Sequence, residues 1–280
     1  MVPIDGKLIA QEIVARLKSL PPPRKFLGAV LVGGDAASEG FLKQKAKVAE
    51  ELGIEFRLHR IPVDGATTDF LREEVGRLAR PKTCGGLIVQ LPLPQAINKH
   101  YVLNAIPKGK DPDMLSETAL GAFYTGRSAI CPPSVGTVEE IVSREGKNLR
   151  ECKAVLMGSG FLTGKPIGFW LQSRVAELTI LDEHAHGLRA KLKDADIVIS
   201  GAGVPRLFSA DDVKDGALII DFGWNKVGGK TMGDFDSSAA SERPAAADIH
   251  YTSTPGGTGP ILVAKLFENF YKLNGAGGAK

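Results

Sequence analysis

Three short segments rich in apolar residues recur in the first third of the chain. Residues 26–32 form a continuous apolar run that ends at Gly-Gly-Asp, and residues 86–91 are apolar except for Gln90 and end at Pro-Leu-Pro. Residues 54–61 form the third segment, in which apolar residues alternate with polar and charged ones. Runs of this length bounded by turn residues are typical of buried strands in a parallel sheet. We therefore expect three strands in this part of the chain.

Amphipathic segments separate these runs. Apolar positions at helical spacing predict helices over residues 5–19, 38–52 and 67–78. Ser38 is a candidate cap for the second helix and Gly53 its stop signal, and Thr67 or Thr68 caps the third. Alternation of strand and helix predicts an α/β fold with a parallel sheet and right-handed crossovers.

The same alternation resumes after a Gly- and Pro-rich stretch over residues 95–134. Strands are expected over residues 154–157, 178–181, 197–200 and 218–221. Helical segments are expected over residues 137–144, 166–172, 188–193 and 209–213. This pattern predicts a Rossmann-like unit.

Two domains follow from these patterns. The first comprises residues 1–134 plus 260–280, because a closing helix over 260–273 can return to pack on it, and the second comprises residues 135–259. Residues 237–247 are rich in Ser, Ala and Pro, which predicts a surface loop.

Composition excludes several classes of protein. Hydrophobic residues make up 43% and charged residues 24% of 280, and the net charge of +3 comes from scattered side chains without a basic block, so no nucleic-acid partner is expected. No apolar run is long enough to span a membrane, and three cysteines are too few for a disulfide scaffold, so we expect a cytoplasmic protein. The five histidines form no convincing ligand cluster, and no metal is expected.

A glycine-rich turn follows the predicted strand at 154–157. Gly158, Ser159 and Gly160 begin a Gly-x-Gly-x-x-x-Gly pattern at a strand-to-helix junction, where backbone amides can approach a pyrophosphate. Asp182 follows 24 positions after Gly158, where a carboxylate accepts hydrogen bonds from an adenosine ribose. A carboxylate there repels a 2′-phosphate, which favours NAD over NADP unless a nearby basic side chain binds that phosphate. The basic candidates are His184, His186 and Arg189. Asp182 could instead merely begin a turn.

In the first domain a lysine and a glutamine are candidates for proton chemistry. Phe41 and Lys45 share one helix face, one turn apart, so the ring lies beside the amine. Gln90 is a polar residue at the end of an apolar strand, and ligands bind at that end of open α/β sheets.

At this point the sequence resembles the methylenetetrahydrofolate dehydrogenase/cyclohydrolase family over essentially its whole length. The matching strings are GGDAAS at 33–38, FLKQKAKVAEELGI from residue 41, GGLIVQLPLP at 85–94, KDPD at 110–113, ISGAGVP at 199–205, ALIIDFGWN at 217–225, GDFD at 233–236 and PGGTGP at 255–260.

The resemblance implies oxidation of 5,10-methylenetetrahydrofolate with NAD or NADP, hydrolysis of the methenyl product to 10-formyltetrahydrofolate, and a homodimer. It assigns Lys45 as the catalytic lysine, Gln90 as the residue that positions it, and Asp113 as the pterin-binding aspartate. Further positions follow by the same matching. Those at the cofactor are Gly158, Ser159, Gly160, Asp182, Gly201 and Gly203, and those at the folate are Gly256, Gly257 and Pro260.

The chain also departs from the family's pattern. Phe41 replaces a tyrosine, which removes a hydroxyl from the proton path and predicts reduced cyclohydrolase activity, and Met114 replaces a glycine after Asp113. The family's Gly-Arg-Ser becomes Gly-Ser-Gly at 158–160, and its His-Ser-Arg-Thr becomes Asp-Glu-His-Ala at 182–185. Both changes remove an arginine that favours NADP.

Three alternatives stay open at this stage. The chain could keep both activities, with Lys45 and a water replacing the missing hydroxyl. It could be a non-catalytic folate-binding paralogue, which Phe41 and Met114 would permit. It could also be an NAD dehydrogenase for another substrate, in which case the match at Lys45, Gln90 and Asp113 would be accidental.

Overall fold

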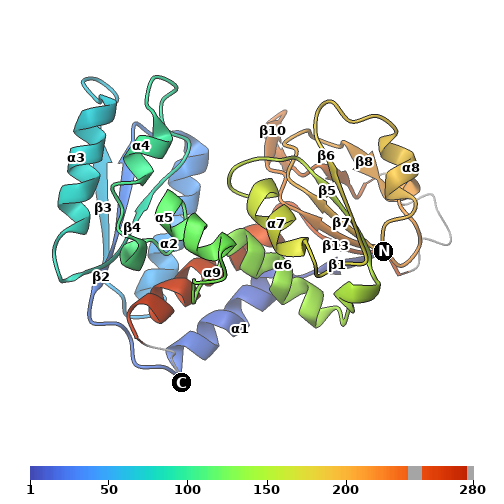
Figure 1. Ribbon diagram of the computed structural model, residues 1–280, viewed down its shortest axis with the longest axis horizontal. Coiled ribbons are helices and arrows are strands. Elements are labelled where there is room, and N and C mark those ends of the chain that lie inside the picture. The colour runs from blue at the N-terminus through green and yellow to red at the C-terminus, as the bar shows by residue number, and fades with distance from the viewer. Residues whose placement is uncertain (239–247, 276–280) are drawn as a thin grey trace. The chain divides into compact units, whose positions relative to one another are not determined.

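The computed structural model describes residues 1–238 and 248–275. The chain divides into two compact units. One consists of Met1–Ala10 and Ser134–Leu262, and the other of Gln11–Pro133 and Val263–Lys280. We call them the six-stranded unit and the three-stranded unit after their main sheets. The predicted α/β class is confirmed (Figure 1). No helix within 1–238 or 248–275 has both the length and the apolar character needed to cross a lipid bilayer.

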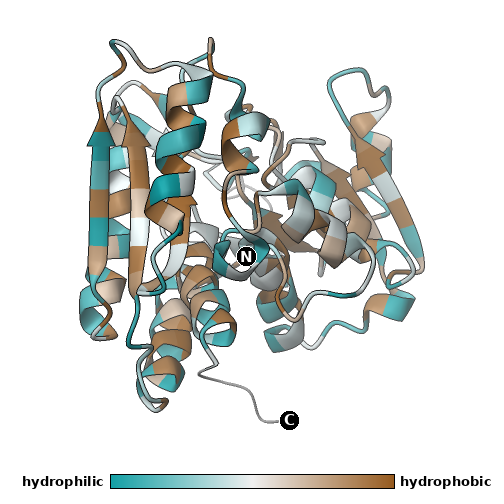
Figure 2. Cartoon of the chain, turned by 60° about the vertical axis from the view of Figure 1, so that its left-hand side comes forward, coloured by the Kyte–Doolittle hydropathy of each residue, from teal (hydrophilic) through white to brown (hydrophobic). Residues whose placement is uncertain are grey.

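The three-stranded unit contains a parallel sheet in the order β3-β2-β4. Its strands are β2 (Phe26–Val32), β3 (Phe56–Ile61) and β4 (Cys84–Val89). All residues of β2 and β4 are buried, which explains their continuous apolar sequence, and Figure 2 shows hydrophobic residues running along the strands. β3, the next strand in the sequence, pairs with one edge of β2, and β4 pairs with the other edge. The carboxyl ends of β2 and β4 therefore flank the point where the strand order reverses, where open α/β sheets bind ligands.

Among the described residues, four helices of this unit lie where helices were predicted, and two short ones lie within residues 95–134, where none was predicted. They are α1 (Gly6–Lys18), α2 (Ala36–Glu51), α3 (Thr68–Ala79), α4 (Lys99–Leu103), α5 (Glu117–Tyr124) and α9 (Thr258–Leu273), with the 3₁₀ turn η1 (Lys108–Lys110). The boundary between the units falls within α1 and within α9. Thr67 caps α3 as predicted. Ser38 does not cap α2, because Asp35 caps that helix and Ser38 lies in its first turn.

The six-stranded unit contains a fully parallel sheet in the order β1-β13-β9-β7-β5-β6. Its strands are β1 (Val2–Ile4), β5 (Lys153–Met157), β6 (Glu177–Leu181), β7 (Ile197–Ser200), β9 (Leu218–Asp221) and β13 (His250–Thr252). β6, which follows β5 in the sequence, pairs with one edge of β5, and β7 pairs with the other edge. The point where the strand order reverses lies between β5 and β7.

Helices and short strands complete this unit. They are α6 (Pro133–Arg144), α7 (Gly164–Leu171), α8 (Leu188–Leu192), the 3₁₀ turns η2 (Leu149–Glu151) and η3 (Ala210–Asp212), the parallel pair β8 (Phe208–Ser209) and β12 (Phe235–Asp236), and the antiparallel pair β10 (Asn225–Val227) and β11 (Lys230–Met232). The helical segment predicted over 209–213 is therefore a single 3₁₀ turn. Part of the predicted loop at 237–247 lies outside the described residues.

Three boundaries differ from the predicted domains, one of them by Ser134 alone, which belongs to the six-stranded unit. Residues 1–10 join the six-stranded unit because β1 pairs with β13, nearly 250 residues later in the sequence. Residues 260–262, at the start of α9, also belong to that unit, and the rest of α9 packs in the three-stranded unit.

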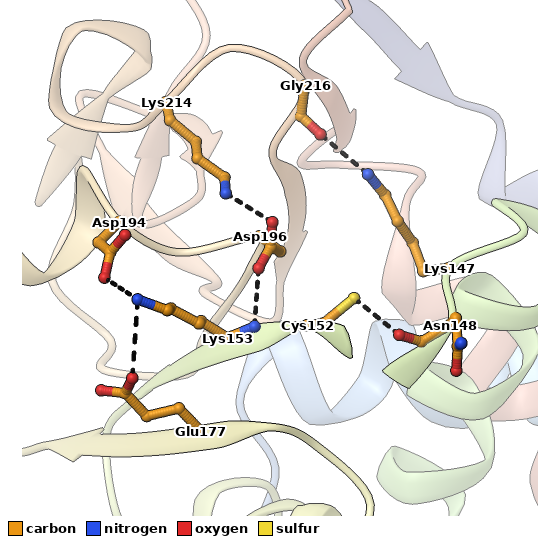
Figure 3. A network of polar contacts seen from close by, with 9 residues as sticks. All are labelled: Lys147, Asn148, Cys152, Lys153, Glu177, Asp194, Asp196, Lys214 and Gly216. Atoms are coloured by element: carbon orange, nitrogen blue, oxygen red, sulfur yellow. Dashed lines mark hydrogen bonds and ion pairs between the residues drawn. The ribbon is translucent and has the colours of Figure 1, made fainter. Parts of the chain in front are cut away.

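Hydrogen bonds and ion pairs of charged side chains connect residues at the amino ends of strands in the six-stranded unit (Figure 3). Lys153, which begins β5, donates its backbone N–H to Asp196 Oδ2 at 2.7 Å and pairs through Nζ with Asp194 Oδ2 at 2.6 Å. Lys214 Nζ donates to Asp196 Oδ1 at 2.5 Å. These pairs are partly exposed and stabilise the fold modestly. The loops at the opposite, carboxyl ends are rich in glycine instead.

Candidate functional site

The ammonium group of Lys45 is the centre of a polar cluster in the three-stranded unit. Asp35 caps α2 by accepting hydrogen bonds from the N–H groups of Ala37 and Ser38, and Lys45 lies ten residues further along that helix. Lys45 is buried, at 8% exposure, whereas the flanking Lys43 and Lys47 are exposed. Burial therefore distinguishes Lys45 from the other two lysines of this segment.

The structure brings together three residues that the resemblance assigned. Lys45 Nζ donates to Gln90 Oε1 at 3.2 Å and lies 3.9 Å from Asp113 Oδ2. Gln90 directly follows β4, and its Nε2 donates to the Leu91 carbonyl at 2.9 Å. That second bond turns the amide so that its oxygen faces the lysine. The three side chains form one cluster from α2, the end of β4 and the loop after η1.

The loop that carries Asp113 is held from two sides. Lys110 Nζ donates to the carbonyls of Ala79 and Pro81 at 2.6 and 2.8 Å, at the end of α3. Asn269 on α9 donates through Nδ2 to the Pro112 carbonyl at 2.9 Å. Neither residue was assigned a role from the sequence: Lys110 was noted only as part of the KDPD string, and Asn269 lies outside the matching strings.

Asp111 fixes the other side of the same loop. Its carboxylate accepts hydrogen bonds from the N–H groups of Leu115 and Ser116 at 3.2 and 2.8 Å, and it is fully buried. Burial raises the pKa of Asp111, against the opposing effect of the bonds from Ser116. Asp111 is therefore a structural carboxylate, whereas the side chain of Asp113 is 23% exposed.

Phe41 and Met114, the two residues at this site that depart from the family's pattern, lie close in sequence to Lys45 and Asp113. Phe41 is half-buried on α2, one turn before Lys45. Met114 adopts φ +57°, in the left-handed region where the family's glycine has no steric cost. Its side chain is 1% exposed and packs with Ala119 and Ile130. Met114 thus combines a backbone conformation that favours glycine with a buried side chain.

The glycine-rich turn of the six-stranded unit follows β5 and begins α7. Gly158 has φ +90°, and a Cβ there would lie 2.6 Å from the Gly201 carbonyl oxygen. A Cβ on Gly164 would lie 2.0 Å from the Gly158 oxygen, whereas a Cβ on Gly160 would meet nothing within 4 Å. The first and third glycines are thus required for the turn and for close packing, and the second leaves the backbone open to a ligand. This division of roles fits a dinucleotide pyrophosphate at the helix N-terminus.

The other predicted cofactor residues lie at the same edge of the sheet. Gly201 follows β7, next to Gly158, and Gly203 has φ +70° with open space around it. Ser159 is exposed in the turn after β5. Asp182 directly follows β6, is exposed, and accepts a hydrogen bond from the His184 N–H at 3.0 Å. Asp182 therefore does begin a turn, and its second oxygen remains available for other donors.

The glycines predicted to contact folate belong to the six-stranded unit, not to the unit of Lys45. Gly256 has φ +103°, and a Cβ on Gly6 would lie 1.8 Å from the Gly257 oxygen. Pro260 lies in the first turn of α9. A Cβ on Gly257 itself would lie 2.5 Å from the Ser253 oxygen, so close packing within the turn before α9 accounts for this glycine without a ligand.

Two buried aspartates in the six-stranded unit were missed by the sequence analysis. Asp221 ends β9, and Asp234 lies in the Gly-Asp-Phe-Asp string at 233–236; they are 1% and 0% exposed. The string was noted for its resemblance, but nothing in it revealed that Asp234 contacts residues more than 30 positions earlier.

Family models match both parts of the chain. Residues 4–113 match the tetrahydrofolate dehydrogenase/cyclohydrolase catalytic domain. Residues 131–276 match the NAD(P)-binding domain of the same family.

Individual relatives match nearly end to end. The chain is 36% identical to the bifunctional protein FolD of Halothermothrix orenii, over 96% of each chain. Among solved structures, it is similar to the FolD methylenetetrahydrofolate dehydrogenase/cyclohydrolase of Campylobacter jejuni, with 28% identity, a TM-score of 0.87 and 97% of each chain covered. It is equally similar to the Trypanosoma brucei enzyme complexed with NADP and an inhibitor, with 28% identity, a TM-score of 0.88, and coverage of 98% of this chain and 97% of that one. The chain therefore belongs to the tetrahydrofolate dehydrogenase/cyclohydrolase family of enzymes.

Proposed function

We propose that this enzyme oxidises 5,10-methylenetetrahydrofolate to 5,10-methenyltetrahydrofolate with NAD as its preferred acceptor, and that it hydrolyses the methenyl product slowly. The observation that carries the proposal is the cluster of Lys45, Gln90 and Asp113. Lys45 Nζ lies 3.2 Å from Gln90 Oε1 and 3.9 Å from Asp113 Oδ2, at the ligand-binding edge of the parallel sheet.

Each residue of the cluster has a distinct task under this proposal. The Asp113 carboxylate accepts two hydrogen bonds from the aminopyrimidinone edge of the pterin, which orients the folate. Gln90 holds Lys45 by its amide oxygen, so that Nζ faces the bridging nitrogens and carbon of the substrate. Lys45 donates or takes up the proton that hydrolysis requires. The burial of Lys45 keeps bulk water away from this amine.

Residues of the six-stranded unit would hold the nicotinamide nucleotide, which accepts the hydride when bound. The backbone around Gly160 would approach the pyrophosphate, and the N-terminus of α7 would stabilise its charge.

Two features support NAD over NADP. Asp182 places a carboxylate directly after β6, where it accepts hydrogen bonds from a ribose and repels a 2′-phosphate. Arg189, one of the basic side chains that could offset this repulsion, pairs through Nε with Asp212 Oδ1 at 3.1 Å. Part of its charge is thus already compensated by the protein.

Phe41 supports slow hydrolysis. Attack of water on the methenyl carbon releases a proton, and a phenyl ring one turn from Lys45 can neither accept it nor relay it. The second candidate is a fully bifunctional enzyme. It is favoured by the intact contact between Lys45 and Gln90, and the relative from Halothermothrix orenii is itself named a bifunctional protein.

Oxidation of 5,10-methylenetetrahydrofolate, followed with NAD and with NADP in parallel, tests the proposal. Absorbance of the reduced nicotinamide and of the methenyl product are recorded together. We expect turnover with NAD at higher kcat/KM than with NADP, and accumulation of the methenyl product. Loss of methenyl absorbance as fast as it forms would favour the bifunctional enzyme, and absence of turnover with both nucleotides would refute the proposal.

A further inference from the structure

Four donors, one at the end of β7 and three in the loop after it, converge on one buried carboxylate. Ser200 Oγ donates to Asp234 Oδ2 at 2.6 Å, and the backbone N–H groups of Ala202 and Gly203 donate to the same oxygen at 2.9 and 3.2 Å. The N–H of Val204 donates to Oδ1 at 3.0 Å. Three successive backbone N–H groups that point at one anion, with Gly203 at φ +70°, form the kind of concave nest that binds phosphate elsewhere. Here the chain fills the nest with its own aspartate.

Asp234 is in turn held by Asp221. Phe235, the residue after Asp234, donates its N–H to Asp221 Oδ2 at 2.9 Å, and Gly223 donates its N–H to Asp221 Oδ1 at 2.7 Å. Both carboxylates occupy space next to a glycine. A Cβ on Gly223 would lie 2.3 Å from Asp234 Oδ1, and one on Gly233 would lie 2.0 Å from Asp221 Oδ2. The two chain segments therefore fit together only with glycine at these positions.

The loop that Asp234 holds borders the glycine-rich turn. Gly201, at its start, carries the carbonyl oxygen that a Cβ on Gly158 would meet at 2.6 Å. Gly158 and Gly201 follow β5 and β7, the neighbouring strands between which the strand order reverses. Residues 202–204 are half-exposed or exposed, so this loop has little hydrophobic burial of its own to keep its shape. Hydrogen bonds to Asp234 supply that order.

We infer that Asp234 is a positioning residue that holds the 201–204 loop in the form that the nicotinamide nucleotide requires. The inference rests on the proposed function, because it presumes that the edge formed by β5 and β7 binds the nucleotide. One consequence is chemical: the N–H groups of residues 202–204 are used by the protein and do not bind the phosphates of the cofactor. Asp234 acts through the loop and does not touch the cofactor.

The test compares Asp234→Asn with Asp236→Asn in the full chain. Asparagine keeps the shape of the side chain but replaces one acceptor oxygen with an NH₂ donor, which then faces buried donors. Asp236, the second aspartate of the same string, bonds instead to Ser238 and Arg206 and serves as the matched control. The Kd of NAD is measured by fluorescence titration, and the Kd of 5,10-methenyltetrahydrofolate is measured separately.

We expect Asp234→Asn to raise the Kd and KM of NAD by about tenfold or more, because charge-assisted bonds to buried donors are lost. The Kd of the folate stays within twofold, and Asp236→Asn leaves both values unchanged. A folded Asp234→Asn that binds NAD like the wild type overturns the inference, and so does an equal loss of NAD and folate binding. Should the wild-type chain bind no nicotinamide nucleotide, the proposed function itself fails.

Ser200→Ala keeps the inference testable if Asp234→Asn does not fold. It removes the hydroxyl donor to Asp234 and leaves the carboxylate in place. We expect a smaller rise in the Kd of NAD, about threefold, again with no change for the folate. An unchanged Kd of NAD in this variant contradicts the inference.

Discussion

At position 41, the absence of a tyrosine hydroxyl is expected to slow hydrolysis of the methenyl product. We predict that Phe41→Tyr raises the rate of methenyltetrahydrofolate hydrolysis by about tenfold or more, because a hydroxyl beside Lys45 can take part in proton transfer. Hydrolysis is followed by loss of methenyl absorbance without nucleotide. Phe70→Tyr, an exposed ring on α3, is the control. An unchanged rate in Phe41→Tyr would show that the hydroxyl does not limit hydrolysis.

In the proposed function, the Asp182 carboxylate accepts hydrogen bonds from the adenosine ribose and sets the preference for NAD over NADP. We predict that Asp182→Ala raises the Kd of NAD by roughly tenfold, the loss expected for a hydrogen bond to a charged group, and narrows the difference between NAD and NADP. Equilibrium titration with both nucleotides measures this. Glu183→Ala, the exposed neighbour, controls for the change in net charge. If Asp182 serves only to begin the turn, the ratio of the two Kd values will not change.

Asp221 makes stability depend on pH. Burial, together with the nearby Asp234, raises the pKa of Asp221 to about 7, although the N–H groups of Phe235 and Gly223 favour its ionised form. Between about pH 4 and pH 7 the folded chain keeps this proton and the unfolded chain loses it, so stability falls as pH rises.

Asp221→Asn tests that dependence. The wild type is predicted to lose up to ~4 kcal/mol of unfolding free energy from this group between about pH 4 and pH 7, and the variant lacks that loss. Urea denaturation at several pH values measures both chains. Parallel pH profiles for the two chains would contradict the assignment.

Residue identity and burial explain which parts of the site could be predicted. The resemblance pointed to Lys45, Gln90 and Asp113, and in the structure Lys45 Nζ lies 3.2 Å from Gln90 Oε1 and 3.9 Å from Asp113 Oδ2. Asp221 and Asp234 could not be predicted, because their hydrogen-bond partners come from loops that only the folded sheet brings together.

At the scale of elements, apolar runs predict strands better than polar residues predict helix starts. The predicted strands at 26–32, 197–200 and 218–221 coincide with β2, β7 and β9, because each is buried along its whole length. The start of α2 was placed two residues late. Ser38 is a good capping residue by type, but Asp35 lies at the position from which the carboxylate reaches the free N–H groups.

The cap of α2 supports the cluster around Lys45. We predict that Asp35→Ala lowers the free energy of unfolding by about 1 kcal/mol, because the N–H groups of Ala37 and Ser38 and the Ser38 hydroxyl lose their acceptor. Chemical denaturation measures the change, and Glu50→Ala, an exposed residue in the last turn of the same helix, is the control. Equal stability of Asp35→Ala and the wild type would contradict the capping role.

The strands β1 and β13 show what local patterns cannot reveal. Each has three residues, and β1 joins the sheet by pairing with β13, which lies nearly 250 residues later in the sequence and pairs with β9 on its other side. Three residues carry too little periodicity to predict a strand. The assignment of residues 1–10 to the six-stranded unit therefore depends on tertiary pairing.

At the scale of the whole molecule, two units carry separable tasks in our account. The three-stranded unit holds the cluster of Lys45, Gln90 and Asp113, and the six-stranded unit holds the glycine-rich turn and the loop fixed by Asp234. We expect a substitution in the Lys45 cluster to change folate chemistry or affinity and to leave the affinity for the nucleotide unchanged. A substitution at the glycine-rich turn or at the loop fixed by Asp234 is expected to do the reverse.

The most direct test of this account compares Lys45→Met with Lys47→Met, its exposed neighbour on α2. Both chains are assayed for oxidation of 5,10-methylenetetrahydrofolate, for hydrolysis of the methenyl product, and for the Kd of NAD. We predict that Lys45→Met lowers kcat/KM for oxidation at least tenfold, reduces hydrolysis to the uncatalysed rate and leaves the Kd of NAD within twofold, whereas Lys47→Met matches the wild type. Full folate activity in Lys45→Met would contradict the account.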